Sequence, residues 1–223
     1  MTGRSRYDGL ADWYDREISG LQVTTTALQT LSRLVGAGPG TCLDLGCGTG
    51  VAIPWLLQRG WRVVGVDLSG DQLRVARQRA AGPGVILIAA NAVALPFADR
   101  SFDAVVSVLT HTDLDDPEVA FAEAARVLRR GGRLSYVGTH PCFVTPFVER
   151  RAEAHLLHPG YRRRGWHYGG PGFGQGIRPR VGVHHLTLAD LIGAALATGL
   201  TVTRLEEPGD DDYPLLIALQ LAK

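Results

Sequence analysis

The sequence predicts an α/β protein whose mostly parallel sheet is doubly wound, with helices on both faces. Two observations lead to this fold class. Short apolar stretches alternate with longer helix-like stretches, which is the pattern of parallel strands connected by helices. A glycine-rich turn at residues 46–50 follows the first of these apolar stretches and opens onto a helix-like run. Such a turn marks the point where a strand passes directly into a helix.

Five strands are expected to alternate with three helices. The strands are expected at residues 41–45, 61–68, 85–90, 101–109 and 133–140. The helices are expected at 51–59, 70–81 and 117–130. The third helix begins at Pro117 and is expected to end at Gly131-Gly132, because glycine is a common stop signal for a helix.

The regular pattern stops between His140 and His185, where glycines, aromatic residues and arginines dominate. It returns with an amphipathic helix over 186–200, ended by Gly199. Two further strands, 201–207 and 213–222, flank the polar turn PGDDD. Because a short turn joins antiparallel strands, these two are expected to form a hairpin that closes one edge of the sheet.

Length and composition describe one ordinary globular domain. The chain has 223 residues, 45% hydrophobic and 20% charged, with a formal net charge of +1, which gives no reason to expect a nucleic acid or a membrane as partner. No apolar run reaches the length of a membrane span, and the N-terminus lacks the apolar core of a signal peptide, so we expect a cytoplasmic protein, monomeric or homodimeric. Cys42, Cys47 and Cys142 predict neither a disulfide framework nor a metal site.

The glycine turn GCGTG has neither of the two common phosphate-binding spacings. A triphosphate loop needs a lysine after its glycines, and none is near, whereas the dinucleotide turn GxGxxG is one residue longer. Asp44, two residues before the turn, would repel a diphosphate but suits a ligand with an ammonium group. Asp67 ends the second strand, where an acid accepts hydrogen bonds from ribose hydroxyls. The predicted ligand is a ribonucleoside with a cationic, phosphate-free tail, which describes S-adenosylmethionine.

These motifs resemble those of the class I S-adenosylmethionine-dependent methyltransferases of the small-molecule type. The resemblance runs from about Tyr7 to Arg130, and more weakly over 185–208. It rests on the 44–50 loop, GVDLS around Asp67, NAVALPFADRSFDAVVS and EAARVLRRGGRL. It implies a Rossmann-like sheet of seven strands, with the last strand inserted antiparallel. It also implies a single domain with four parts: an N-terminal helical cap (1–36), a cofactor-binding core (37–139), an irregular lid insertion at the acceptor site (140–185), and a C-terminal helix and hairpin (186–223).

The resemblance also assigns roles to cofactor-binding residues. It implies that Asp67 holds the ribose, Leu68 packs on the adenine, Asn91 and Ala92 bracket the base, and Tyr7 closes over the methionine end. Most relatives carry an acid where Asn91 stands, and an amide oxygen can accept the same hydrogen bond. Three alternatives stay open: Tyr7 as a core aromatic, Cys47 as packing, and Asn91 as a turn residue. The expected cofactor contacts are Tyr7, Asp44, Gly46, Cys47, Gly48, Gly50, Asp67, Leu68, Gln72, Asn91, Ala92 and Val108.

Candidate catalytic residues lie just beyond the fourth and fifth strands, where such sheets bind their ligands. His111 is expected to act as a general base, with Asp113 near enough to influence it, and His140 is the second candidate. Both histidines have a packing role as the alternative. The acceptor pocket is expected to use Trp166, Tyr168, Phe173 and His185. Arginines 162–164 are either a carboxylate clamp or a solvated basic loop.

The sequence therefore predicts an enzyme that transfers a methyl group from S-adenosylmethionine to an O or N atom of a small-molecule metabolite. The alternative is an enzyme that binds S-adenosylmethionine without methylating and promotes a rearrangement or cyclisation. Release of S-adenosylhomocysteine during turnover distinguishes the two. An NAD-dependent dehydrogenase is disfavoured by the tighter glycine spacing and by Asp44.

Overall fold

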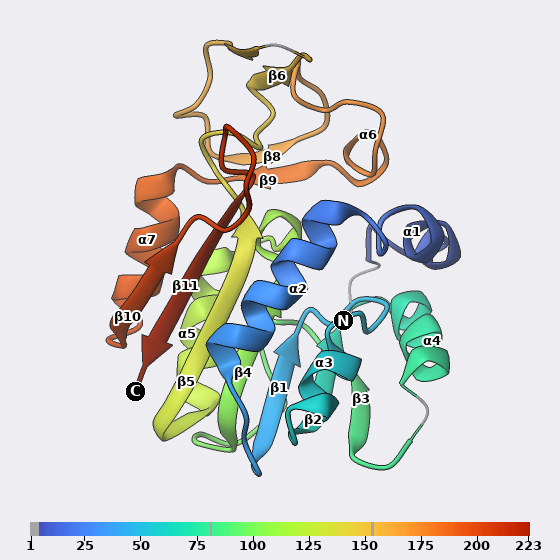
Figure 1. Cartoon of the computed structure of the whole chain (residues 1–223), viewed down its shortest axis with the longest axis vertical. Coiled ribbons are helices and arrows are strands. Elements are labelled where there is room, and N and C mark those ends of the chain that lie inside the picture. The colour runs from blue at the N-terminus through green and yellow to red at the C-terminus, as the bar shows by residue number, and fades with distance from the viewer. Residues whose placement is uncertain (1–4, 81, 153) are drawn as a thin grey trace.

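The computed structural model describes residues 5–80, 82–152 and 154–223 and is built around a seven-stranded sheet (Figure 1). The strand order is β3-β2-β1-β4-β5-β11-β10. The strands are β1 (Thr41–Leu45), β2 (Arg62–Asp67), β3 (Val85–Ala89), β4 (Phe102–Val108), β5 (Leu128–Thr139), β10 (Thr201–Glu206) and β11 (Leu216–Ala222). Strands β1 to β5 run parallel, and β11 is antiparallel to both its neighbours, β5 and β10. The expected fold class is confirmed, including the inserted antiparallel last strand.

Helices cover both faces of this sheet. They are α2 (Gln22–Val35), α3 (Ile53–Gln58), α4 (Gly70–Arg79), α5 (Pro117–Val127) and α7 (Leu188–Ala197). Helix α1 (Ala11–Glu17) packs mainly on α4. Helix α4 lies within the expected 70–81, of which residue 81 is outside the described residues, as are residues 1–4 of the expected cap. No helix in the described ranges is long and apolar enough to cross a membrane.

The α5–β5 junction differs from the sequence prediction. Helix α5 ends at Val127, not at Gly131-Gly132, and the chain enters β5 at once. Leu128 is fully buried and pairs with Phe102 of β4, so strand pairing takes over before the glycines are reached. The Lys223 ammonium donates to the carbonyl oxygens of Ala125 and Leu128, which satisfies the end of the helix.

Alternate residues of each central strand enter different hydrophobic layers, as the two-residue period of a strand requires. Leu43 of β1 and Val105 of β4 join α5 and α7 on one face. Cys42 and Val106 join α2 and α3 on the other. Helix α2 packs on β4, β5 and β11 and so forms part of the layer of helices that covers this face of the sheet.

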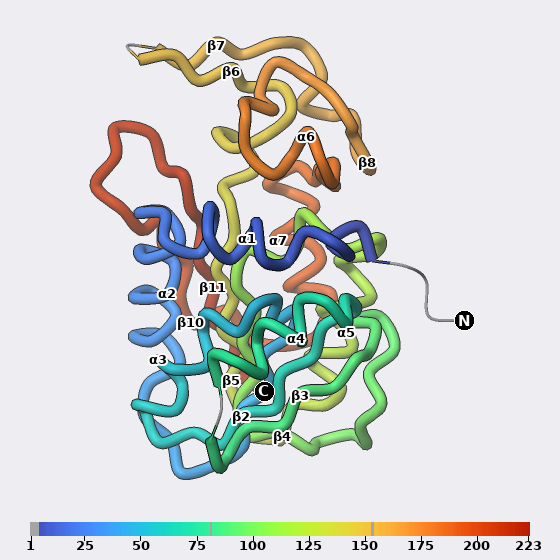
Figure 2. Tube along the Cα trace, turned by 90° about the vertical axis from the view of Figure 1, so that its right-hand side faces the viewer, coloured from blue at the N-terminus to red at the C-terminus, as the bar shows by residue number. Residues whose placement is uncertain are grey.

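The segment between β5 and α7 lies beyond the carboxyl ends of the parallel strands (Figure 1). It contains two small antiparallel sheets of two strands each, β6 (Val148–Arg150) with β7 (His155–Leu157) and β8 (Gly165–His167) with β9 (Val183–His185). A short helix, α6 (Arg178–Val181), precedes β9. Figure 2 shows α1 at a level between the sheet and this insertion. The insertion and the N-terminal segment therefore meet over the end of the sheet where the strands finish.

Candidate functional site

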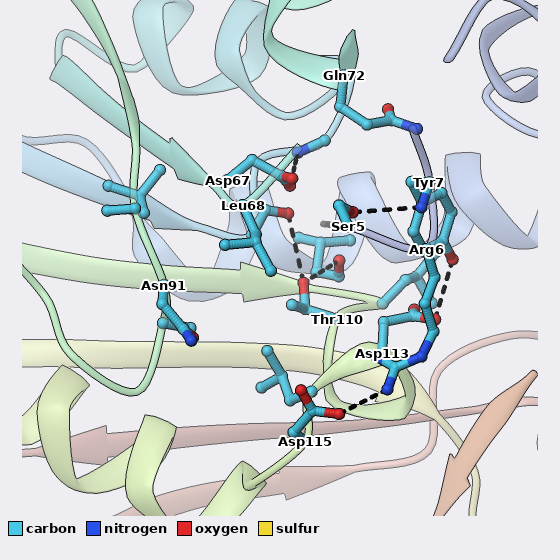
Figure 3. Close-up of a pocket in the computed structure, with 18 of the residues that line it drawn as sticks. Ser5, Arg6, Tyr7, Asp67, Leu68, Gln72, Asn91, Thr110, Asp113 and Asp115 are labelled. Atoms are coloured by element: carbon cyan, nitrogen blue, oxygen red, sulfur yellow. Dashed lines mark hydrogen bonds and ion pairs between the residues drawn. The ribbon is translucent and has the colours of Figure 1, made fainter. Parts of the chain in front are cut away.

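A cavity of about 310 Å³ lies at the carboxyl ends of β1, β2 and β4. Its walls come from the strand ends, the N-terminal segment, the loop after β4 and the insertion. Figure 3 shows Asn91 on one side and Tyr7 with Asp113 on the other. The lining residues are Ser5, Arg6, Tyr7, Tyr14, Gly46, Gly48, Val66, Asp67, Leu68, Gln72, Ala90, Asn91, Ala92, Val108, Leu109, Thr110, Asp113, Leu114, Asp115 and Trp166.

The glycine turn lets backbone form the floor of this cavity. Gly46 has φ +71°, and a Cβ at this position would lie 2.3 Å from Thr110 Cγ2. Gly48 has φ +53°, and its N–H donates to Asp67 Oδ2 at 2.9 Å. Both conformations favour glycine, because a side chain is strained at positive φ. The turn thus brings unobstructed backbone against the cavity and ties it to the tip of β2.

Asp67 is buried at the end of β2 and is held by two backbone donors. Its second donor is Ser69 N–H, which reaches Oδ1 at 2.8 Å. Burial raises the pKa of Asp67 to about 6, and the two backbone hydrogen bonds oppose part of that rise. The carboxyl group is therefore fixed in direction at the cavity wall and is ionised at neutral pH.

Asp44 on β1 and Gln72 on α4 hold polar atoms that lack a partner. Asp44 Oδ2 and both side-chain polar atoms of Gln72 are buried without a hydrogen bond among the described residues. Burial, and then the Asp67 charge, raise the pKa of Asp44 to about 7. A buried carboxyl group without a counter-charge is unfavourable, so this end of the site is suited to a cationic ligand.

Two polar networks join the N-terminal segment to the loop after β4 and to the insertion. The Tyr7 hydroxyl donates to Asp113 Oδ1 at 3.0 Å, and Arg178 Nη1 donates to the same oxygen at 2.6 Å. In the second network, Asp115 Oδ1 accepts from Arg6 Nη2 at 2.8 Å and from Trp166 Nε1 at 2.9 Å. The Arg6 guanidinium also lies 3.6 Å from the centre of the Trp166 ring. Three distant segments of the chain thus close the cavity together.

Most of the residues that form this site lie in a segment that is similar to known methyltransferases. The model of a methyltransferase domain family matches residues 43–136, which contain the glycine turn, Asp44, Asp67 and Asn91. The expected resemblance to the class I S-adenosylmethionine-dependent methyltransferases is confirmed over these residues. The demethylmenaquinone methyltransferase of Thermobifida fusca is 38% identical over 141 residues, covering 57% of each chain. Methyltransferase GfsG of Streptomyces halstedii is 41% identical over 98 residues, covering 42% of this chain and 35% of that protein. The chain thus spans little more than half of the length of the first of these relatives, and less of the second.

A solved structure matches nearly the whole fold. The S-adenosylmethionine-dependent methyltransferase from Mesorhizobium loti aligns with a TM-score of 0.73 over 92% of this chain and 99% of that one, at 24% identity. At this identity the match concerns the fold. The methyltransferase family uses S-adenosylmethionine as its cofactor, and the described residues fit it. Asp44 Oδ2 is buried without a hydrogen-bond partner among the described residues, so a positively charged group nearby would stabilise its ionised form. Asp67 presents a hydrogen-bond acceptor of fixed orientation at the end of the adjacent strand.

Most residues expected from the methyltransferase resemblance to contact the cofactor line the cavity. They are Tyr7, Gly46, Gly48, Asp67, Leu68, Gln72, Asn91, Ala92 and Val108. Asn91 Oδ1 also accepts from Val93 N–H at 3.2 Å, so the expected turn role is present together with the position at the cavity. The second lone pair of this oxygen and the amide N–H groups are available to a ligand.

Three other expected contacts lie behind the cavity wall. Asp44, near the end of β1, is 2% exposed and is not among the residues that line the cavity. The Cys47 side chain points at the sheet, where a Cβ on Gly65 would lie 2.9 Å from its Sγ, so Cys47 acts as packing. Gly50 allows the turn to approach α4, since a Cβ there would meet Ala76 at 3.1 Å. Cys47 and Gly50 therefore shape the turn without touching the cavity.

The two expected general bases are not at this cavity. His111 begins a short 3-10 helix, is 4% exposed, and its Nδ1 lies 2.6 Å from the Tyr136 hydroxyl. Burial, and then the Arg178 charge, lower the pKa of His111 to about 3. His140 is 2% exposed; its Nδ1 accepts from Cys142 N–H, and its Nε2 lies 2.8 Å from Glu207 Oε1. Both rings are engaged in the interior, so this geometry corrects the expectation that they act as bases.

The expected acceptor residues are only partly brought together. Trp166 lines the cavity, and the exposed Tyr168 ring stacks on it with the ring centres 6.1 Å apart. His185 is buried, and its Nε2 lies 2.7 Å from the Tyr161 carbonyl oxygen, away from the cavity. Phe173 is not among the lining residues either. Trp166 pairs with His184 across the two strands, so these two side chains share one face of the pair, and His185, the next residue along β9, belongs to the other face.

Several cavity residues were not expected as ligand contacts from the sequence. Tyr14 belongs to the same YDGLADWYD stretch as Tyr7, and its ring packs edge-on against Tyr7 at 5.5 Å between centres. Asp113 was expected beyond the fourth strand as a residue that influences His111, and not as a ligand contact. The signal that could have found both Asp113 and Asp115 is their place directly after β4, at the sheet edge where such folds bind ligands. Nothing in the local sequence pointed to Arg178.

Proposed function

We propose that this protein transfers a methyl group from S-adenosylmethionine to a small-molecule acceptor. The observation that carries the proposal is the pair Asp44 and Asp67 at adjacent strand ends, one buried without a counter-charge and one fixed at the cavity wall. A nucleoside with a cationic tail satisfies both acids at once. When bound, S-adenosylmethionine supplies an activated methyl group on its sulfonium, which an acceptor attacks in line as the carbon–sulfur bond breaks.

The chain's own residues would divide the cofactor between them. Asp67 would accept from the ribose hydroxyls, and Gln72 would contact the methionine end of the cofactor. Asp44, which lies behind the cavity wall, would interact with the ammonium group through an intervening group or water. Leu68, Asn91 and Ala92 would hold the adenine. Tyr7 would cover the methionine end, where it lines the cavity with Tyr14. Such alignment, with water excluded, is the main requirement for methyl transfer and is worth about 7–11 kcal/mol in well-oriented reactions.

We further propose a planar acceptor that contacts Trp166. This side chain lines the cavity, its indole N–H is fixed on Asp115, and the Arg6 guanidinium lies over its ring, so it forms a rigid aromatic part of the cavity wall. Several relatives, among them the one from Thermobifida fusca, are named demethylmenaquinone methyltransferases, and one from Desulfotalea psychrophila is named a ubiquinone/menaquinone biosynthesis C-methyltransferase. Those names favour carbon as the acceptor atom over the O or N atom expected from the sequence. No histidine at the cavity is needed for such a transfer if the acceptor ring is itself electron-rich.

The test is an incubation of the protein with isotopically methyl-labelled S-adenosylmethionine and a panel of quinols, phenols and amines. Labelled product together with equimolar S-adenosylhomocysteine is expected, and NMR of the product assigns the methylated atom. Asp67→Ala, which removes the ribose acceptor, is the matched control and should give less labelled product at a subsaturating cofactor concentration. A converted substrate without S-adenosylhomocysteine would instead support the non-methylating alternative. Failure of the folded protein to bind S-adenosylmethionine at all would overturn the proposal.

A further inference from the structure

Three segments that are far apart in the chain meet at Asp113. The Tyr7 hydroxyl, from the N-terminal segment, and Arg178 Nη1, from α6 in the insertion, both donate to Asp113 Oδ1. Arg178 Nη2 also donates to Thr112 Oγ1 at 2.9 Å. Tyr7 and Asp113 line the cavity, whereas Arg178 stands behind them. The arginine therefore contacts the cavity only through the residues that it holds.

The Arg178–Asp113 pair is built to hold one orientation. The two side chains are 22% and 17% exposed, so water competes little for their charges. Although burial opposes the Arg178 charge, Asp113 and then Tyr7 raise the pKa of Arg178, and the guanidinium stays ionised. A guanidinium with two separate acceptors cannot rotate without losing one of them. The Asp113 carboxylate is thus fixed in direction.

Tyr7 depends on that direction. Burial, and then the Asp113 charge, raise the pKa of Tyr7 well above its ordinary value, so its hydroxyl remains a donor throughout the neutral range. Among the described residues, the Tyr7 hydroxyl forms a hydrogen bond with Asp113 alone. A carboxylate that turned away would leave this buried hydroxyl unpaired, at the cost of an unsatisfied polar group. The position of Tyr7 over the cavity therefore follows the orientation of Asp113.

We propose that Arg178 is a positioning residue: by fixing the orientation of Asp113, it holds Tyr7 and the N-terminal segment over the cavity. The inference rests on the proposed function in taking the cavity to be the S-adenosylmethionine site. Its consequence is that the insertion contributes to cofactor binding through a residue that does not touch the cofactor. Events in the insertion, such as acceptor binding, are then linked to cofactor affinity in both directions.

Two routes from α6 to the N-terminal segment must be separated. Arg178 acts through Asp113 and Tyr7, whereas Arg180 lies over the Trp13 ring of α1, 4.4 Å from its centre. The test is a double-mutant cycle on S-adenosylhomocysteine affinity, measured by calorimetry, with Tyr7→Phe, Arg178→Gln and the double variant. We expect each single change to weaken binding about tenfold, the loss associated with one hydrogen bond to a charged group. The affinity of the double variant should lie within about twofold of the affinity of the weaker-binding single variant, because both changes break the same chain of contacts.

The control Arg162→Gln removes an exposed arginine of the same insertion and should leave affinity within about twofold. Arg180→Gln, which removes the second route, should add its effect to that of Tyr7→Phe. The proposal would be overturned if the fold-losses in affinity caused by Arg178→Gln and Tyr7→Phe multiplied in the double variant. It would also be overturned if the Arg178→Gln variant bound S-adenosylhomocysteine as tightly as the native protein. Where Arg178→Gln lowers the yield of folded protein, Arg178→Lys keeps the charge, loses the second acceptor contact and enters the same cycle.

A second measurement needs no ligand. Amide hydrogen exchange over residues 5–17 should become faster in Arg178→Gln than in the native protein and should not change in Arg162→Gln. It should be no faster in the Tyr7→Phe, Arg178→Gln double variant than in Tyr7→Phe. Unchanged exchange in Arg178→Gln contradicts the positioning role even if no cofactor binds. Failure of the native protein to bind S-adenosylhomocysteine, with exchange as expected, counts against the proposed function alone.

Discussion

The Tyr136 hydroxyl lies 2.6 Å from His111 Nδ1 in the interior of the protein. Tyr136 is 1% exposed on β5, and its ring also packs on Phe121 of α5, with the ring centres 5.5 Å apart. The contact joins the loop after β4 to the hydrophobic layer between the sheet and α5. It makes His111 a buried, neutral hydrogen-bonding group, and the following predictions begin from this role.

His111 should make the protein less stable in acid. Its pKa of about 3 lies below the ordinary value of 6.5, so the unfolded chain takes up a proton that the folded protein does not. Stability from this group is complete above pH 6.5 and is lost as the pH falls toward 3, by at most about 1.4 kcal/mol per pH unit. In urea unfolding at pH 5 and 7, His111→Gln should show a shallower pH dependence than the native protein. Equal slopes, or a large fall in S-adenosylhomocysteine affinity in the folded variant, would count against the interior role.

Asp67→Ala should weaken S-adenosylmethionine binding by about 1.5–3 kcal/mol, which is the usual contribution of hydrogen bonds to a charged group. In the native protein the affinity should also fall as the pH drops below about 6, because the protonated carboxyl group is a poorer acceptor. Calorimetry at pH 5, 6 and 8 measures both effects. Asp210→Ala, in the exposed turn before β11, is the control and should bind normally. An unchanged affinity in folded Asp67→Ala would remove its ribose role.

Asp44→Asn should stabilise the ligand-free protein and weaken its binding to the cofactor. The folded pKa of about 7 is raised above 3.8, so ionising this buried group costs stability as the pH rises from 3.8 through 7. The amide avoids that cost, and we expect the free energy of unfolding at pH 8 to increase by at least about 1 kcal/mol. The gain should shrink at pH 5, as read by thermal unfolding.

Asp103→Asn is the matched control for Asp44→Asn. Asp103 lies at the opposite end of the sheet, where Thr41 N–H and then Arg129 lower its pKa. Because the folded protein stabilises its charged form, the amide should destabilise the protein at pH 8. Stabilisation by both changes, or by neither, would mean that burial of the Asp44 charge is not the cause.

Gly46→Ala should disrupt the glycine turn. The φ of +71° costs an L-residue about 1–2 kcal/mol, and the new methyl group would lie 2.3 Å from Thr110 Cγ2. We expect a lower melting temperature and no measurable S-adenosylhomocysteine binding. Gly193→Ala, on an exposed part of α7 with open space around it, should instead stabilise by up to about 1 kcal/mol. Normal binding by Gly46→Ala would show that the backbone of the turn does not approach the ligand.

The cofactor end of the site was predictable from the sequence because its signals are local. The strand 41–45 was expected from its apolar run, and the structure confirms it as β1. Asp44 and Asp67 stand at or near the ends of strands that pair in parallel, and parallel strands bring their carboxyl ends to one edge of the sheet. The glycine spacing specified a turn with positive φ at Gly46, Gly48 and Gly50. Periodicity and turn chemistry thus predicted the strands, the turn and the two acids, whereas the other expected cofactor contacts came from the resemblance to the methyltransferases.

The direction of side chains beyond the strands was decided only by the tertiary structure. The short 3-10 helix after β4 sends His111 to Tyr136 and Asp113 to the cavity, although the two residues are two positions apart. Arg178 reaches Asp113 across 65 positions of sequence, through an insertion with no regular hydrophobic period. Loop conformations of this kind are set by long-range packing and by the pairing of buried charges, and neither leaves a repeating pattern along the chain.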